Sequence, residues 1–238
     1  MRAENVSRLT YFKTNLSDPH YLVYKFLFRD IQAAVADHAR GDVFDMGCGN
    51  KPYEPLFSNI TSYTGCDVVQ SSENKVDVIC STTSVPLGNE KFDTVFSTQV
   101  MEHVEEPQQM LHEAYRLLRN NGKIILTVPM VWEHHEVPHD FYRYTKYGLE
   151  YMFKKAGFVN INVKANGGKW ATLGQLTQNI LDDSLRGKKG LFRKILWLPY
   201  RYCFKYLINV LYYWMDKVDG AEHVITLNFI VVADKKTA

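Results

Sequence analysis

Hydrophobic residues in this 238-residue chain follow two alternating patterns. Short apolar runs between turn signals are typical of buried strands, whereas apolar residues spaced three and four apart indicate helices. An expected helix over residues 19–39 comes first, and strand and helix patterns then alternate. Strands are expected at residues 43–47, 62–69, 76–80, 92–98, 123–129, 158–164 and 223–235, with helices at residues 107–119 and 146–156.

The strand patterns are nearly continuous in apolar residues, and helices separate several of them. This arrangement predicts an α/β fold in which helices cover both faces of a mostly parallel sheet. No linker rich in proline, glycine or serine divides the chain. We therefore expect a single domain over residues 1–238, with an N-terminal helical lead-in over 1–40 and a helical insertion over 166–222 before the last strand.

Composition narrows the class of protein. The chain is 46% hydrophobic and 13% aromatic, which is enough to bury a core. Its four cysteines lack the spacing of a zinc site, and the polar first ten residues do not resemble a signal peptide. We expect reduced thiols and a cytoplasmic location.

The expected insertion is both basic and aromatic. Residues 184–215 contain seven cations and no acid, so a chain of net charge +2 has +2 − 7 = −5 elsewhere. Residues 191–215 carry nine aromatic side chains, but the cations among them make a poor transmembrane helix. Pro199 is expected to break or kink this helix. A narrow polar stripe beside a wide apolar face is predicted by the helical spacing of Arg201, Lys205, Asn209 and Asp216.

Several partners suit such a segment. A helix of this kind can lie in a membrane interface and be attracted by anionic lipid. It can equally cap an acceptor site, form a dimer interface or pack on the sheet. The long uncharged run over residues 206–215 disfavours nucleic acid as the partner.

A glycine-rich turn follows the first expected strand in VFDMGCGN, residues 43–50. In open α/β sheets, ligands bind at the carboxyl ends of the strands. A dinucleotide motif would carry a third glycine where this chain has Pro52, and Asp45 would repel a pyrophosphate. An acid there suits a ligand with an amino group and a positive centre. Asp67, at the end of the second strand, can accept both hydroxyls of a ribose.

These motifs resemble the class I S-adenosylmethionine-dependent methyltransferases. The resemblance runs from about Asp42 to Phe158 and includes D-x-G-x-G at residues 45–49, followed by the acid Asp67. It continues with the V-P-L turn at 85–87, VMEHV at 100–104 and LLRNNGKIILTVP at 117–129. The resemblance implies a Rossmann-like doubly wound sheet of seven strands with an antiparallel last strand. It also implies S-adenosylmethionine as cofactor and S-adenosylhomocysteine as product.

The same resemblance assigns cofactor contacts. Asp45 and the backbone of residues 47–49 (Gly47, Cys48 and Gly49) would hold the methionine end of the cofactor, and Asp67 would hold its ribose. Gln99 would line the site near the sulfonium. Where the family carries an acid for the adenine, this chain has Ser81, whose neighbour Thr82 could contribute a backbone N–H. Glu102 and His103 would support the loop after the fourth strand.

A polar and aromatic block, MVWEHHEVPHDFYRYT, follows the fifth strand at residues 130–145. A loop in this place faces the reactive end of the cofactor, where an acceptor must sit. His139 with Asp140 supplies a candidate base and an orienting carboxylate, and His135 is the alternative base. The acceptor-binding candidates are Tyr142, Arg143 and Tyr144. The alternative is a packed loop whose polar groups satisfy one another.

A metal site is not expected in this block. His135 and His139 are four residues apart, a spacing that would place both on one face of a helix. Pro138 lies between them and argues against a helix, so the spacing carries no ligand geometry.

The string PHDFYRYT, residues 138–145, resembles a block in those methyltransferases that are associated with glycan and surface-polysaccharide assembly. The resemblance implies O-methylation of a sugar in a cell-envelope glycan, or in its lipid- or nucleotide-linked precursor. One alternative is a lipid or quinone-like acceptor at the membrane, and another is a non-catalytic, membrane-docked regulatory subunit that binds the cofactor. We expect a cytoplasmic protein that associates peripherally with the inner face of the membrane.

Overall fold

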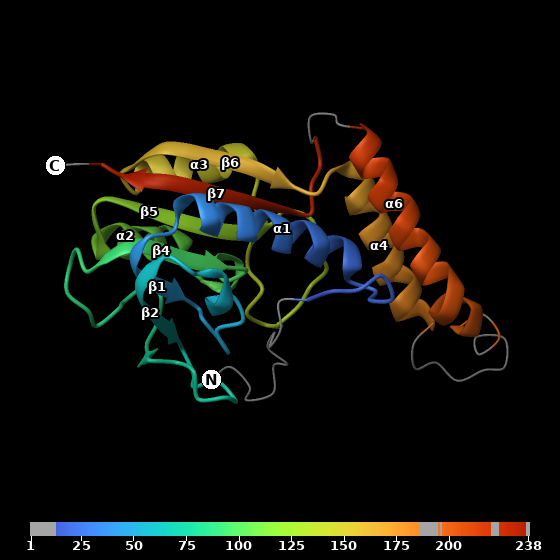
Figure 1. Ribbon diagram of the computed structural model, residues 1–238, viewed down its shortest axis with the longest axis horizontal. Coiled ribbons are helices and arrows are strands. Elements are labelled where there is room, and N and C mark those ends of the chain that lie inside the picture. The colour runs from blue at the N-terminus through green and yellow to red at the C-terminus, as the bar shows by residue number, and fades with distance from the viewer. Residues whose placement is uncertain (1–12, 186–194, 196, 220–223, 237–238) are drawn as a thin grey trace.

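The computed structural model describes residues 13–185, 195, 197–219 and 224–236. Its described residues form a seven-stranded sheet of order β3-β2-β1-β4-β5-β7-β6 (Figure 1). Strand β7 runs antiparallel to both its neighbours, while the other strands are parallel to one another. The predicted doubly wound fold with an antiparallel last strand is confirmed. The strands are β1 (Gly41–Met46), β2 (Ile60–Asp67), β3 (Val78–Ile79), β4 (Phe92–Thr98), β5 (Leu118–Pro129), β6 (Phe158–Asn166) and β7 (Asn228–Lys235).

Helices cover both faces of the sheet. Helix α1 (Tyr21–His38) packs on one face, and α2 (Pro107–Leu117) and α3 (Lys146–Lys155) pack on the other. Neighbouring residues in a strand point to opposite faces, so Val43 contacts the α1 side and Phe44 the α2 side. This double burial explains why the strands read as continuous apolar runs.

Strand β5 begins earlier than the predicted strand at residue 123. Leu118 already pairs with Phe92, and the register then shifts before Lys123 pairs with Thr94. Asn121 has a φ of 62°, and a Cβ on Gly122 would lie 2.8 Å from the carbonyl oxygen of Arg119. Asn121-Gly122, a dipeptide typical of turns, is therefore an irregularity inside one strand.

A helical pair occupies most of the expected insertion. Helix α4 (Lys169–Leu185) packs against α6 (Lys205–Asp219), beyond the end of the sheet to which the parallel strands point (Figure 1). Pro199, which is expected to break or kink the helix, lies in a helical segment that leads directly into a π-helical turn, η3 (Tyr200–Phe204), and then into α6, so the helix is irregular here but continues. Within the described residues, no helix is long and apolar enough to cross a membrane.

Some predictions concern residues outside the described part of the chain. These are the start of the lead-in over 1–12, the first residue of the predicted last strand, His223, and the cations Arg186, Lys188, Lys189, Arg193 and Lys194. The four cysteines are all described, and each is free.

Candidate functional site

The turn after β1 requires glycine. Gly47 has a φ of 84° and Gly49 a φ of 51°, conformations that side chains disfavour. A Cβ on Gly47 would lie 2.4 Å from a methyl carbon of Val100. The turn is therefore wedged against the segment that follows β4, which brings the ends of β1 and β4 together.

A cavity of about 460 Å³ lies at the carboxyl edge of the sheet, beside this turn. Helix α1, the end of β4 and the segment after it, the loop after β5 and strand β7 also contribute to its lining. The predicted cofactor residues that line it are Asp45, Gly47, Cys48, Gly49, Asp67 and Gln99. The structure thus brings together residues from the ends of three strands, as the parallel topology requires.

Asp45 places a buried carboxyl group in this cavity. The Tyr63 hydroxyl donates a hydrogen bond of 2.7 Å to its Oδ2. Burial raises the pKa of Asp45 to about 7, although the Tyr63 hydrogen bond and the nearby Lys51 charge act in the opposite direction. A ligand with a positive charge would stabilise the ionised form of this carboxyl group.

Asp67 is held in place by the backbone. Its Oδ2 accepts a 3.2 Å hydrogen bond from the Gly49 N–H, and its Oδ1 accepts a 2.7 Å bond from the Val68 N–H. The carboxylate is therefore fixed at the point where the glycine turn meets the end of β2. A carboxylate in this position suits the hydroxyls of a ribose.

A second cavity, of about 390 Å³, continues the first. Both cavities are lined by Gly47, Asp67, Val100 and His103, so they form one groove along the sheet edge. Ser81 and Thr82 line the second cavity, and the Ser81 hydroxyl lies 2.8 Å from the Thr83 hydroxyl. The groove therefore runs from Asp45 to the Ser81 region, in the order expected for the methionine, ribose and adenine parts of the cofactor.

Gln99 adopts an unusual backbone conformation at the end of β4. Its φ is 53°, and its N–H donates a 3.0 Å hydrogen bond to the carbonyl oxygen of Thr127. The side-chain amide donates a 3.1 Å bond to the Thr127 hydroxyl. Strained backbone held by two such bonds is typical of functional sites.

The loop after β5 is held by an ion pair. Two nitrogens of Arg143 donate hydrogen bonds of 2.7 and 2.8 Å to the two Asp140 oxygens, and the His135 N–H donates a third, of 3.1 Å. Burial alone would raise the pKa of Asp140, but these bonds and the nearby positive charges hold it below its ordinary value. Arg143 also donates to the carbonyl oxygen of Glu133. Asp140 therefore orients this loop and is not paired with His139.

Tyr142 and Tyr144 are also engaged within the protein. The Tyr142 hydroxyl donates a 2.9 Å bond to the carbonyl oxygen of Glu105, and the Tyr144 hydroxyl donates one of 2.9 Å to that of Met101. Tyr144 is buried in the core, and neither tyrosine lines the two cavities, nor does Arg143. This placement gives no support to the predicted acceptor contacts, which stay predictions, and the hydrogen bonds are those expected of a loop that satisfies its own polar groups.

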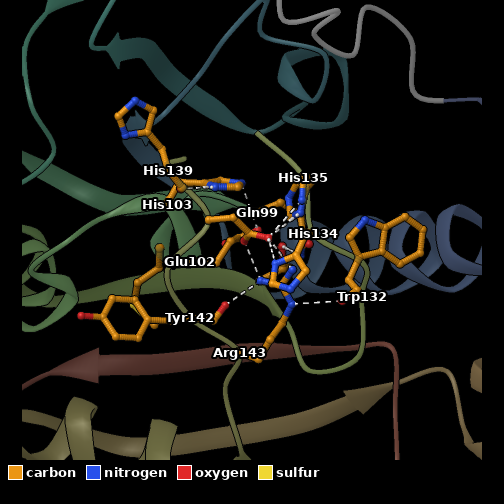
Figure 2. Close-up of polar contacts among 12 residues, drawn as sticks. Gln99, Glu102, His103, Trp132, His134, His135, His139, Tyr142 and Arg143 are labelled. Carbon is orange, nitrogen blue, oxygen red and sulfur yellow. Dashed lines mark hydrogen bonds and ion pairs between the residues drawn. The ribbon is translucent and has the colours of Figure 1, made fainter. Parts of the chain in front are cut away.

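The two candidate bases lie in different parts of the groove. His135 lines the larger cavity together with Gln99, whereas His139 lines the second cavity together with Ser81. Figure 2 shows the His139 ring pointing away from Arg143, the residue that pairs with Asp140. His139 therefore lies on the side of Ser81, the residue expected at the adenine, and its role as the base stays a prediction.

The His135 ring has a defined orientation. Its Nδ1 lies 3.2 Å from the carbonyl oxygen of Glu133 and 3.4 Å from Oδ2 of Asp140. Both neighbours are acceptors, so a proton on Nδ1 is favoured and Nε2 is left to accept one. The carboxylate–imidazole pair foreseen for Asp140 thus exists with His135.

Glu102 and His103 meet His135 at the boundary between the two cavities. Ligand-type atoms of these three residues lie within 4.8 Å of one another, and their types could hold a metal ion. These three residues are not the pair, His135 and His139, whose spacing in the sequence raised the question of a metal site. Burial raises the pKa of Glu102 to about 8, and neither carboxyl oxygen has a hydrogen-bond partner in the described part of the chain. A neutral carboxyl group is therefore favoured there at neutral pH.

Several lining residues could not be identified from the sequence. Helix α1 contributes Val23, Tyr24 and Leu27 to the larger cavity, and β7 contributes Asn228. These elements reach the site only through the packing of the sheet, so no local motif marks them. Trp132 and Glu136 also line the cavity, and both belong to the polar block that the sequence singles out.

Comparisons with known proteins agree with this geometry. Residues 44–126, about a third of the chain, match the family described as "Methyltransferase domain". With the strand order and the glycine turn, this match supports S-adenosylmethionine-dependent methyl transfer, with S-adenosylmethionine as the cofactor. Over 159 residues it is 25% identical to an uncharacterized protein of Methanocaldococcus jannaschii, an alignment that covers 60% of this chain and 76% of the relative.

Solved structures share the fold at low sequence identity. The cyclase SpnF is 16% identical with a TM-score of 0.59, over 98% of this chain and 89% of SpnF. A possible histamine N-methyltransferase of Thermotoga maritima is 16% identical with a TM-score of 0.54, over 91% and 93% of the two chains. Phosphoethanolamine N-methyltransferase 2 of Haemonchus contortus, solved with S-adenosylmethionine, is 17% identical with a TM-score of 0.53. That comparison covers 87% of this chain and 53% of the Haemonchus protein. At these identities the likeness describes the fold, which hosts more than one reaction.

Proposed function

We propose that the protein methylates a hydroxyl oxygen of a sugar in a cell-envelope glycan, or in its lipid- or nucleotide-linked precursor. The proposed reaction type rests on the position of His135. This imidazole lines the cavity that Asp45 and Gln99 also line, and Asp140 lies against its Nδ1. A base so placed is what an alcohol needs in order to become a nucleophile.

The cofactor contacts of the proposal follow the groove. Asp45 and the backbone of residues 47–49 would hold the methionine end, Asp67 the ribose, and Ser81 and Thr82 the adenine. The fit rests on charge and space: a buried carboxyl group faces the amino end, and the Gly47 turn leaves no room for a side chain. When bound, S-adenosylmethionine supplies an electrophilic methyl group on a positively charged sulfur. Gln99, fixed by Thr127, would line that end.

His135 would take the proton of the acceptor hydroxyl on Nε2 as the oxygen–carbon bond forms and the carbon–sulfur bond breaks. Asp140 would stabilise the resulting imidazolium through Nδ1 and hold the ring in one tautomer. Because Arg143 keeps Asp140 ionised, the carboxylate would not itself take the proton. This assignment makes His135 the base, a role for which the sequence suggested His139 first and His135 as the alternative.

The acceptor side of the cavity suits a sugar. The rings of Tyr24 and Trp132 line it, and such rings pack well against the apolar faces of sugars. Glu136 and Asn228 add polar groups that can accept or donate hydrogen bonds to hydroxyls. The resemblance of PHDFYRYT to glycan-associated methyltransferases supports the same acceptor class.

We further propose that the protein works at the inner face of a membrane, where a lipid-linked precursor would be presented. An exposed apolar face on the helical pair supports this location. The same face also favours a second candidate function, methylation of a lipid or quinone-like acceptor. The third reading, a regulatory subunit that binds the cofactor without catalysis, predicts binding but no turnover.

Release of S-adenosylhomocysteine in the presence of defined glycans, glycolipids and quinones tests the function. His135→Ala should lower kcat by about 10²–10⁴-fold, because a positioned base is lost, while calorimetric affinity for S-adenosylmethionine stays the same. His134→Ala is the matched control, since this neighbouring imidazole is 91% exposed. Turnover only with quinones would favour the second candidate. Unchanged turnover in His135→Ala would exclude the base assignment, and cofactor binding without turnover on every acceptor would favour the regulatory reading.

A further inference from the structure

The helical pair buries its polar residues. Gln178 and Asn209 are completely buried between α4 and α6, where the Gln178 amide donates a 3.0 Å hydrogen bond to Asn209. Asn209 in turn donates to the carbonyl oxygens of Leu16 and Asp18. Asp216 accepts hydrogen bonds of 3.0 Å from backbone N–H groups at and near the start of α4. The predicted polar stripe of α6 therefore turns toward the protein at Asn209 and Asp216.

The opposite side of α6 is apolar and exposed. Leu207, Leu211, Trp214 and Val218 follow one another at intervals of four, three and four residues, and each is more than half exposed. Such spacing places them in one stripe along the helix. Other apolar side chains of the pair are also exposed, namely Leu173, Ile180, Leu198, Tyr202, Phe204, Tyr206 and Val210. We call these exposed apolar side chains the apolar face. They belong to residues 198–218, in α6 and the segment that leads into it, and to Leu173 and Ile180 of α4.

Helix α6 buries the amide side chain of Asn209 and exposes leucine and tryptophan. This is the reverse of the usual arrangement in a surface helix of a protein surrounded by water. Amphipathic helices of water-exposed proteins turn the apolar stripe inward. Large contiguous apolar surfaces mark contacts with a partner or a membrane. The amides of Gln178 and Asn209 are satisfied by hydrogen bonds, whereas the buried Nδ2 of Asn179 has no partner among the described residues.

The sequence of residues 184–215 is basic, with seven cations and no acid, and its described cations are Arg201 and Lys205. Arg201 is exposed at the start of the face, with its guanidinium 4.8 Å from the Trp197 ring centre. Aromatic rings beside cations suit the interface of an anionic bilayer.

We infer that the apolar face docks on a membrane surface that contains anionic phospholipid. Helix α6 would lie in the interface with its leucine and tryptophan side chains among the acyl chains. The pair stands beyond the carboxyl edge of the sheet, the same edge at which the cavity lies (Figure 1). Docking there would hold the acceptor side of the enzyme near the lipid headgroups. The inference deepens the proposed location but does not depend on the proposed acceptor.

Flotation with vesicles tests the docking. The full chain should float with vesicles of phosphatidylcholine and phosphatidylglycerol, and much less with phosphatidylcholine alone or at high salt. Leu211→Glu and Trp214→Glu should each weaken vesicle binding by on the order of tenfold or more, because an apolar anchor becomes an anion. Tyr147→Glu on α3 is the matched control: this exposed aromatic is not part of the apolar face, and its substitution should leave flotation unchanged.

The measurements separate the alternatives. Failure of the wild-type chain to float, or equal flotation of all variants, would overturn the inference. A dimer that Trp214→Glu dissociates, in a chain that does not float, would assign the face to a second copy instead. Circular dichroism and cofactor calorimetry show whether each variant remains folded. A wild-type chain that turns over an acceptor but does not float would reject docking alone, whereas a wild-type chain that floats without turnover on any acceptor would reject the proposed reaction alone.

Discussion

The turn after β1 and the loop after β5 both end at the carboxyl edge of the sheet, yet they use their polar residues differently. Beside the turn, Asp45 near the end of β1 and Asp67 at the end of β2 present carboxyl groups to the cavity. In the loop, Asp140 and Arg143 bind each other and hold the loop, and only part of it, including His135, reaches the cavity. A polar residue near the site is thus available for a ligand when its side chain lines the cavity, as those of Asp45 and Asp67 do although both accept hydrogen bonds from the protein.

Removal of Asp140 should have the largest effect, because the loop depends on it. Its side chain is 2% exposed, and Asp140→Ala leaves Arg143 without its carboxylate and His135 without its acceptor. We expect a loss of roughly 3 kcal/mol in the free energy of unfolding and nearly complete loss of turnover. Denaturant unfolding and S-adenosylhomocysteine release measure the two effects. A variant as stable and active as the wild type would show that the ion pair does not hold the loop.

Gly47→Ala should act next most strongly, through the turn. The added Cβ meets Val100 at 2.4 Å and the φ of 84° is strained, so roughly 1–3 kcal/mol of strain is expected. Because the turn shapes the cofactor groove, S-adenosylmethionine should bind at least about tenfold more weakly by calorimetry. Gly88→Ala is the control, since its Cβ would meet only the end of the Lys91 side chain. Equal affinity in both variants would contradict a tight turn at Gly47.

The raised pKa of Asp45 predicts a smaller effect, a pH dependence of the affinity of the groove for S-adenosylmethionine. Its pKa is raised to about 7, and an ammonium ligand requires the ionised form. Affinity for S-adenosylmethionine should therefore be constant above about pH 7 and fall by about tenfold for each pH unit below it. Calorimetry between pH 5.5 and 8.5 measures this. Asp45→Asn should bind weakly without this pH dependence; a wild-type affinity that does not change with pH would remove Asp45 from the ammonium contact.

Metal removal should have the smallest effect. The proposed proton transfer uses His135 and Asp140 and needs no metal ion, so turnover should be unchanged after treatment with a chelator. Glu102, His103 and His135 are the residues to follow, since they could hold an ion by their types. A metal-assisted mechanism would replace the base mechanism if chelation abolished turnover and one divalent metal restored it in the wild type but not in Glu102→Gln.

Local sequence determined the architecture and the cofactor side of the site. The period of apolar residues is a direct consequence of strand and helix geometry, so the strands and most helices were predictable to within a few residues. The glycine turn was predictable because Gly47 must accept a backbone conformation that few residues tolerate. Asp45 and Asp67 followed because they end neighbouring parallel strands, which brings them to one edge.

Tertiary structure alone decided which polar groups remain available and which surfaces face outward. His135 and His139 are four residues apart, but the fold of their loop places them in different cavities. Tyr24 reaches the site because α1 packs across the sheet. The spacing of Asn209 and Asp216 predicted a polar stripe on α6 but not its direction. Only the packing against α4 turned that stripe inward, because a helical period records which residues share a face and not what that face contacts.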